Sequence, residues 1–150
     1  MIGHLQSNKV KRALQFATLI ESVDSLHLAR EIEREAAAQG KIIECFLEVN
    51  TSGESQKFGI APGEAEALAG DLAGLPHLHL TGLMTIGALS TDSQRIRSCF
   101  SQLRKVQERL NASGLGISQL SIGMSDDFEI AIEEGATIIR LGRALFGERN

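Results

Sequence analysis

Two short segments near the end of the chain combine small and polar residues in an order that favours phosphate binding. In the first, an apolar stretch leads into the Gly-Met-Ser sequence of residues 123–125, and in the second another leads into Gly142 and Arg143. We expect each apolar stretch to be a strand and each turn to start a helix. The first backbone N–H groups of a helix lack partners and attract anions. The sequence therefore predicts that a phosphorylated small molecule binds at these two turns.

The residues of the two turns have separate expected roles. Ser125 is expected to cap a helix over residues 126–134 and to offer its hydroxyl to the phosphate; the alternative is helix capping without a ligand. Gly142 allows close approach of the backbone, and the Arg143 amide completes the site. The alternative for this second turn is a tight turn that closes the domain. The guanidinium of Arg143 is a further candidate partner for phosphate.

These turns depend on strands and helices that alternate along the whole chain. Apolar and β-branched stretches predict five strands, and amphipathic stretches with capping residues predict the helices between them. Strands that alternate with helices pair in parallel, either in a doubly wound sheet or in a barrel. A closed barrel of this kind needs eight strands and typically about 250 residues. The expected strands are residues 18–23, 41–49, 77–86, 119–122 and 137–141. The expected helices are 7–16, one that Asp24 or Ser25 caps and that runs to about residue 39, 62–72, a long one that Thr91 or Asp92 caps and whose apolar positions span 96–110, and 126–134.

Composition limits the class of protein. The 150 residues suffice for one domain, residues 1–150, and 43% hydrophobic with 23% charged residues is typical of a globular protein. The net charge of -4 gives no basic surface for nucleic acid. No apolar run is long enough to cross a membrane and no secretory pattern opens the chain, so the expected compartment is the cytoplasm. Cys45 and Cys99 show no metal or disulfide spacing and are expected to be buried or idle thiols.

Five motifs identify a family that the chain resembles. They read I-G-H-L-Q-S-N-K at 2–9, E-V-N-T-S-G-E-S-Q-K-F-G at 48–59, G-L-M-T-I at 82–86, S-I-G-M-S-D-D at 121–127 and R-L-G-R-A-L-F-G at 140–147. Together they resemble the pyridoxal phosphate homeostasis proteins, which bind pyridoxal 5′-phosphate (PLP) and are similar in fold to the N-terminal barrel of alanine racemase. The resemblance implies a parallel (β/α) barrel of the TIM and alanine racemase type that is incomplete, with about five of its eight strands.

The resemblance also implies which residues would contact PLP. Ser125 matches a serine that binds the phosphate, and Arg140 matches an arginine that faces the pyridine nitrogen and makes the cofactor a weaker electron sink. An arginine that reaches out to solvent at a barrel rim is the alternative for Arg140. Members of the family often have Ser or Thr in place of Arg143, whose backbone donor is retained here. Three residues at predicted strand ends are further candidates for lining the pocket, with packing or surface positions as the alternative: Met84, His4 and Asn50.

One feature of the family has no counterpart in this chain. Family members are longer, and an N-terminal strand carries the lysine that forms a Schiff base with PLP. Residues 1–6 read like the end of a strand that runs into a helix, so we expect an N-terminally truncated barrel that binds PLP non-covalently at best. Lys57, in a polar loop, is expected to add a solvated positive charge to the rim rather than to replace the missing lysine.

These expectations leave three functions open. The first is a carrier or regulator in PLP homeostasis, without turnover. The second is an amino acid racemase, which uses a lysine and a tyrosine on opposite faces of PLP, whereas this sequence has no Tyr. The third is a barrel fragment without a ligand, which would associate with itself through open sheet edges. No nucleic-acid or membrane partner is expected.

Overall fold

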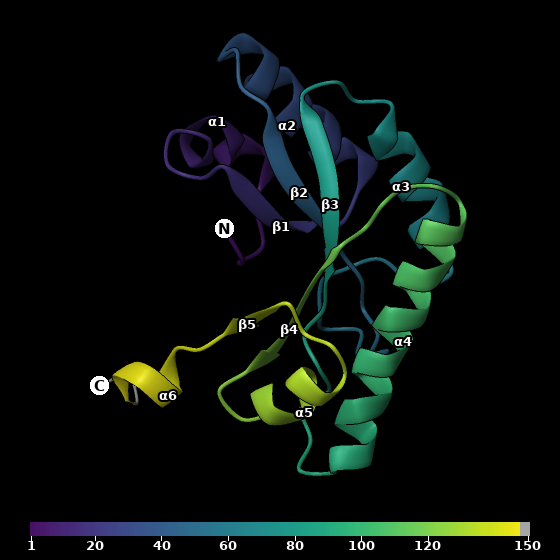
Figure 1. The fold of residues 1–150 in the computed structure, drawn as a ribbon. Helices are drawn as coiled ribbons and strands as arrows, with labels where there is room; N and C mark the ends of the chain where they lie inside the picture. Colours follow the sequence, from purple (N-terminus) through teal and green to yellow (C-terminus); the bar gives the residue numbers. More distant parts are fainter. Residues whose placement is uncertain (148–150) are drawn as a thin grey trace.

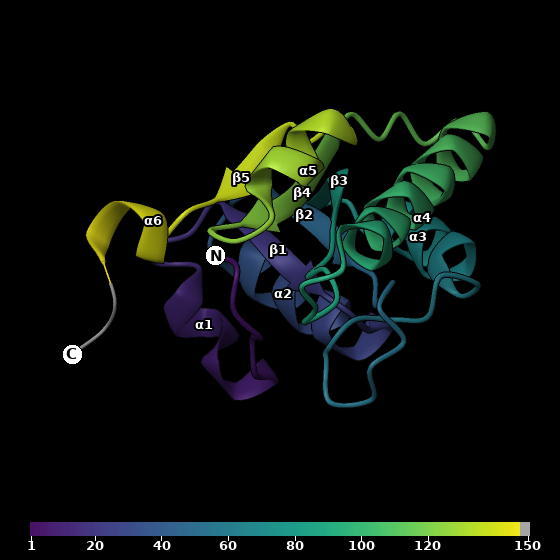
Figure 2. The same ribbon diagram turned by 90° about the horizontal axis from the view of Figure 1, so that it is seen from below.

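A computed structural model, which describes residues 1–147, shows five parallel strands in one curled sheet (Figures 1 and 2). The strands follow one another in chain order, β1-β2-β3-β4-β5. A doubly wound sheet would reverse its strand order at a switch point, so the barrel alternative is confirmed and the sheet is part of a (β/α) barrel. The strands are β1 (Leu19–Val23), β2 (Ile43–Glu48), β3 (Leu78–Met84), β4 (Gln119–Met124) and β5 (Ile138–Arg140).

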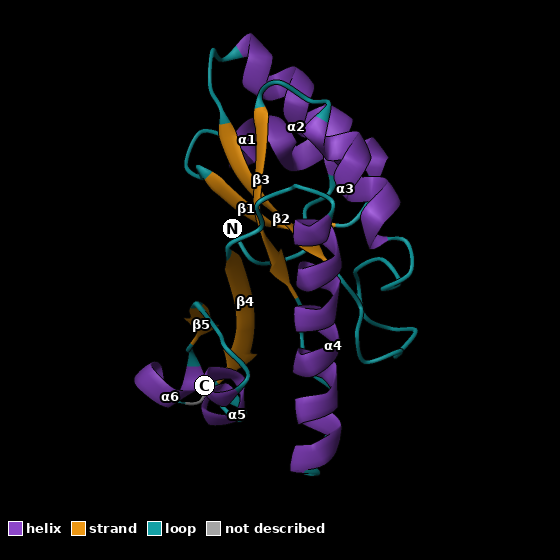
Figure 3. Cartoon of the chain, turned by 45° about the vertical axis from the view of Figure 1, so that its right-hand side comes forward, coloured by secondary structure: helices purple, strands orange, loops and turns teal. Residues whose placement is uncertain are grey.

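Helices connect the strands and cover the outer face of the sheet. Figure 3 shows α2, α3 and α4 beside the first three strands, with α5 and α6 gathered around β4 and β5. None of the helices in residues 1–147 has the length and apolar character to span a bilayer. The helices are η1 (Ser7–Lys9), α1 (Val10–Ala13), α2 (Leu26–Ala38), α3 (Ala65–Ala73), α4 (Ser93–Ala112), α5 (Phe128–Glu133) and α6 (Arg143–Phe146).

The first residues of the chain lie along the edge of β1. The Met1 amino group donates to the Leu19 carbonyl at 2.5 Å, and the Glu21 amide donates to the Met1 carbonyl at 2.8 Å. This alternation is the hydrogen-bond pattern of a parallel strand pair. The Ser22 hydroxyl adds a bond to the Gly3 carbonyl at 2.8 Å. The structure assigns no strand to residues 1–6, so that this segment is the end of a strand stays a prediction.

The two faces of the sheet have different chemistry. Along β2, Ile43, Cys45 and Leu47 belong to the apolar core under the helices. Side chains alternate along a strand, so Phe46 and Glu48 lie on the opposite, inner face of the curl. Burial raises the pKa of the Cys45 thiol to about 12, as expected for an inert core cysteine. The outer face therefore stabilises the sheet through apolar packing, and polar side chains such as Glu48 lie on the inner face.

Candidate functional site

A cleft of about 960 Å³ lies at the carboxyl ends of the strands. Its walls come from the loops that follow β2, β3, β4 and β5, and this is the end where (β/α) barrels place their ligands. Ser125, Arg140, Gly142 and Arg143 all line it. The sequence placed these four residues in one site, and the structure brings them together.

Side-chain contacts join the two turns directly. The Ala144 amide donates to the Ser125 hydroxyl oxygen at 3.1 Å, and the Arg143 guanidinium pairs with the Asp126 carboxylate. The turn after β4 and the turn after β5 therefore face each other across a short gap. Because Asp126 engages the guanidinium of Arg143, the backbone amide of Arg143 is the better phosphate donor.

The helix after β4 begins later than the sequence predicts. Ser125 is not its N-cap, because α5 starts at Phe128 and Asp127 precedes it. The Asp127 carboxylate accepts the Met124 amide at 2.6 Å, and the Asp127 amide donates to the Met124 carbonyl at 3.1 Å. These two bonds close a turn over residues 124–127, which displaces the start of the helix. Since α5 and α6 are short, individual amides matter more here than helix dipoles.

Four backbone amides at this junction have no hydrogen-bond acceptor among residues 1–147, and they belong to Ser125, Asp126, Gly142 and Arg143. A Cβ added at Gly142 would meet no protein atom within 4 Å. The added Cβ would therefore lie in open space, and Gly142 is one of the residues that line the cleft. A cradle of unpaired N–H groups with a glycine at its floor fits a phosphate group.

Arg140 points inward from β5. Its Nη1 donates to the Ser121 hydroxyl at 2.7 Å and its Nη2 donates to the Thr85 carbonyl at 2.8 Å. The alternative of an arginine that reaches out to solvent is therefore wrong. Burial lowers the pKa of the guanidinium, and the nearby Glu21, Asp127 and Glu48 carboxylates oppose that shift. Arg140 is a fixed cation on the inner wall of the cleft.

The rest of the cleft offers an apolar surface. Exposed apolar side chains line it from the loop after β3, from the last residue of β4 and from α6: Ile86, Leu89, Met124 and Phe146. Exposed apolar groups around a few convergent donors are typical of small-molecule sites. The cleft therefore suits a ligand with a flat apolar ring and one anionic end.

Three candidates from the sequence lie away from the cleft lining. Met84 is buried at 1% exposure and is not among the residues that line the cleft. His4 stacks on Phe58 with 3.8 Å between ring centroids. The Asn50 side chain donates to the Glu54 carbonyl at 2.9 Å and accepts the Gly53 amide at 3.1 Å, so it shapes its own loop. The expectation that these residues contact a ligand is not supported by their positions.

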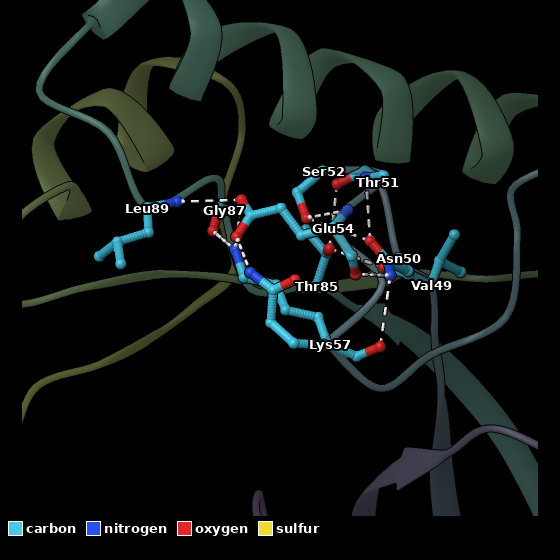
Figure 4. Close-up of polar contacts among 11 residues, drawn as sticks. Val49, Asn50, Thr51, Ser52, Glu54, Lys57, Thr85, Gly87 and Leu89 are labelled. Atoms are coloured by element: carbon cyan, nitrogen blue, oxygen red, sulfur yellow. Dashed lines mark hydrogen bonds and ion pairs between the residues drawn. The ribbon is translucent and has the colours of Figure 1, made fainter.

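Lys57 does reach the rim, but it is not solvated as predicted. Its ammonium group donates to the Glu54 carboxylate at 3.1 Å and to the Gly87 carbonyl at 2.5 Å (Figure 4). The same carboxylate accepts the Leu89 amide at 3.2 Å. The hydrogen bond from Lys57 is the main reason that the pKa of Glu54 lies below its ordinary value. The bonds to Gly87 and Leu89 join the loop after β2 to the loop after β3, and Glu54 offsets the positive charge of Lys57 within its own loop.

Sequence reasoning assigned no role to two buried acids on the inner face. Glu21 on β1 is 6% exposed and Glu48 on β2 is 4% exposed. Burial is the main cause that raises the pKa of Glu48 to about 7; Asp24 adds to the shift and Arg140 opposes it. The sequence did contain a signal for these two residues, because each is a glutamate within an apolar strand. A buried carboxylate is costly unless it has partners, so such a position indicates a structural or functional role.

Comparison with protein families gives one match over the full chain. The model of the family described as "Alanine racemase, N-terminal domain" matches residues 1–150. A curated relative, the "Pyridoxal phosphate homeostasis protein" of Aquifex aeolicus, is 41% identical over 99% of this chain. The alignment covers 65% of that relative, so the chain spans about two thirds of its length.

Solved structures agree with this match. A protein of Bifidobacterium adolescentis, described as "an unknown protein", superimposes with a TM-score of 0.93 at 46% identity, covering 97% of this chain and 59% of the other. PipY of Synechococcus elongatus, solved with PLP bound, superimposes with a TM-score of 0.86 at 34% identity, covering 97% of this chain and 68% of PipY.

Proposed function

The chain belongs to the alanine racemase N-terminal domain family, and from that premise we propose that it binds PLP non-covalently as a carrier in PLP homeostasis. Two kinds of relative support this proposal. The Aquifex aeolicus relative is named for PLP homeostasis, and PipY has been solved with PLP bound. We further propose a cytoplasmic site of action, which is consistent with two free, buried cysteines.

The observation that carries the proposal is the pair of turns with unpaired amides. We assign the phosphate to the backbone N–H groups of Ser125, Asp126, Gly142 and Arg143, which have no acceptor within residues 1–147. A phosphate dianion accepts several such bonds at once, and bonds to a charged acceptor are stronger than neutral ones. The Ser125 hydroxyl oxygen holds the Ala144 amide, so this side chain also fixes the distance between the turns.

The remaining parts of PLP have partners in the same cleft. The apolar side chains of Met124 and Ile86 offer a surface for the ring. We assign the ring nitrogen to Arg140, whose permanent positive charge disfavours a second positive charge beside it. Bound PLP supplies an aldehyde and an electron-withdrawing ring. The residues of this chain bind and orient it, and the absence of any Tyr from the sequence argues against a racemase.

Calorimetric titration tests the proposal. We expect PLP and pyridoxine 5′-phosphate to bind the chain, and pyridoxine, which lacks the phosphate, to bind at least about tenfold more weakly. Pyridoxine 5′-phosphate has no aldehyde, so its binding cannot arise from a Schiff base with a lysine.

A matched pair of glycine variants locates the binding. Gly142→Ala places a methyl group in the cradle and should weaken pyridoxine 5′-phosphate binding by about tenfold or more. Gly63→Ala is the control, because a Cβ there also meets no atom within 4 Å and Gly63 does not line the cleft. A folded chain that binds neither phosphate ester contradicts the proposal, and equal affinities of the two variants contradict the assigned cradle.

A further inference from the structure

We infer that Glu21 and Ser121 are positioning residues for Arg140. A hydrogen-bond chain that starts on β1 and passes through β4 fixes the guanidinium on β5, so that its remaining N–H groups are available to a ligand in the cleft. The geometry of this chain is independent of any ligand. Its effect on the ring nitrogen of a bound pyridine rests on the proposed function.

The chain of bonds has one possible direction. The Ser121 hydroxyl donates to the Glu21 carboxylate at 2.5 Å, and the Arg140 Nη1 donates to the Ser121 oxygen at 2.7 Å. Arginine has only donors and an ionised carboxylate has only acceptors, so the single serine proton must lie on the Glu21 side. Ser121 is fully buried and Glu21 is 6% exposed, so bulk solvent has little access to this bond.

A second bond fixes the plane of the guanidinium. Arg140 Nη2 donates to the Thr85 carbonyl at 2.8 Å, and the Thr85 hydroxyl in turn donates to the Val49 carbonyl at 2.6 Å. Figure 4 shows Thr85 beside Val49 and Thr51, where the loop after β2 meets the end of β3. With Nη1 and Nη2 each held, the group cannot rotate without breaking a bond. These two bonds therefore also fix the direction of the other N–H groups of the guanidinium. Arg140 lines the cleft, so a ligand there can accept from them.

The placement of Glu21 indicates a role beyond stability. β1 and β5 are the first and last strands of the sheet, and only its curl brings Glu21 and Arg140 to the same serine. A buried carboxylate and guanidinium lose hydration, so a buried ion pair seldom stabilises more than apolar residues of the same size. An apolar pair would fill the same space, but it would not orient a donor at the cleft.

Three carboxylates of residues 1–147 act on the charge of the guanidinium. Glu21 acts from β1, Glu48 from β2 and Asp127 from the turn before α5. Of these three, Glu21 is connected to Arg140 through a hydrogen bond to Ser121. The positioning role therefore predicts that the acceptor atom at position 21 matters more than its charge.

Three variants separate position from charge. Glu21→Gln keeps an acceptor for the Ser121 hydroxyl and removes the charge. Glu21→Met keeps a similar volume without a strong acceptor, and Ser121→Ala removes the link. Glu44→Gln is the matched control, because Glu44 is an exposed glutamate on β2. Thermal unfolding is measured first, so that only folded variants enter the comparison.

The first measurement needs no ligand. Nitrogen-15 NMR of the Arg140 guanidinium reports its rotation rate in the free chain. We expect slow rotation in the wild type, with Glu44→Gln equal to it and Glu21→Gln within about threefold. Ser121→Ala and Glu21→Met should rotate at least about tenfold faster, since a charge-assisted bond is lost. Fast rotation in the wild type, or equal rates in Glu21→Gln and Glu21→Met, would overturn the inference.

The second measurement uses bound pyridoxine 5′-phosphate. Its absorption spectrum against pH gives the midpoint for protonation of the ring nitrogen. A held guanidinium should keep this midpoint below that of the free ligand, and Ser121→Ala and Glu21→Met should return it towards the free value by about one pH unit. Glu21→Gln should keep the midpoint below that of the free ligand, as in the wild type. Absence of binding in a wild type with slow guanidinium rotation contradicts the proposed function and supports the positioning inference.

Discussion

The two ends of the sheet are built differently. β1, β2 and β3 have five to seven residues each, and their outward side chains lie in the main apolar core under α2, α3 and α4. β5 has three residues, all half-buried, and α5 and α6 have six and four residues. The first end uses its backbone groups in strand ladders, whereas the second end leaves four amides without acceptors in the described chain.

This difference separates the source of stability from the site of binding. Buried apolar area on long strands provides most of the free energy of folding. Unpaired donors are poorly tolerated in such a region, because a buried N–H without a partner is costly. A short, half-exposed end of the sheet can keep donors available until a ligand accepts their bonds. The carboxyl-terminal turns are therefore suited to binding because they contribute little to the core.

The largest expected contrast is between two phenylalanines. Phe100 on α4 is fully buried, and Phe146 on α6 is 87% exposed. Phe100→Ala should lower the free energy of unfolding by roughly 3–5 kcal/mol through lost burial and a cavity. Phe146→Ala should change it by less than about 0.5 kcal/mol. Urea denaturation followed by circular dichroism measures both, and comparable losses would contradict the division between the two ends.

The second contrast is between the buried Glu48 and the exposed Glu44 in their effect on how stability depends on pH. The pKa of Glu48 is raised from 4.5 to about 7, so the folded state holds a proton that the unfolded state has released. Stability should therefore fall as pH rises from about 4.5 through 7 and then level off, by roughly 3 kcal/mol in total. Glu48→Gln should lack this fall, while Glu44→Gln at an exposed position should keep it. Denaturation curves at pH 5 and pH 8 measure it, and parallel pH dependence of the wild type and Glu48→Gln would contradict the assignment.

The strands could be predicted from the sequence because each depends on a local pattern. The expected strands 77–86 and 137–141 contain β3 and β5 with only the ends trimmed. The start of α5 could not be predicted in the same way. Ser125 and Asp127 are both good capping residues, and the bond from the Met124 amide to Asp127 decides between them only in three dimensions.

The site was predicted where backbone turns define it and was missed where distant side chains meet. Gly142 and Ser125 follow from glycine and serine at strand ends. Glu21 and Ser121 are 100 residues apart in sequence, and their contact depends on the curl of the whole sheet. Because His4 and Asn50 lie at predicted strand ends, the sequence predicted that both are near the rim of the barrel, but it did not predict the direction of their side chains. In the structure His4 stacks on Phe58 and Asn50 bonds to its own loop, and neither lines the cleft.

Two glycines sharpen the comparison at the binding end. A Cβ at Gly123 would lie 2.5 Å from the Ala131 Cβ, and its φ of 90° is unfavourable for other residues. Gly123→Ala should therefore lower the free energy of unfolding by roughly 2 kcal/mol. Gly142→Ala has open space and an ordinary φ, so its effect should be within about 0.5 kcal/mol. Chemical denaturation of both variants tests this, and a large loss in Gly142→Ala would show that this turn is structural.

The smallest expected effect concerns the two edges of the sheet. The β1 edge is partly covered by Met1, whereas β5 pairs only with β4 within residues 1–147. Exposed apolar residues lie near each edge, Phe16 before β1 and Phe146 after β5. An open edge beside apolar surface favours association between chains, so we expect concentration-dependent self-association. Phe146→Lys should weaken it by about tenfold and Phe16→Lys by less, since a charge beside an open edge opposes pairing. Sedimentation equilibrium measures both constants; a monomer at every concentration, or a larger effect of Phe16→Lys, would show that β5 is not the associating edge.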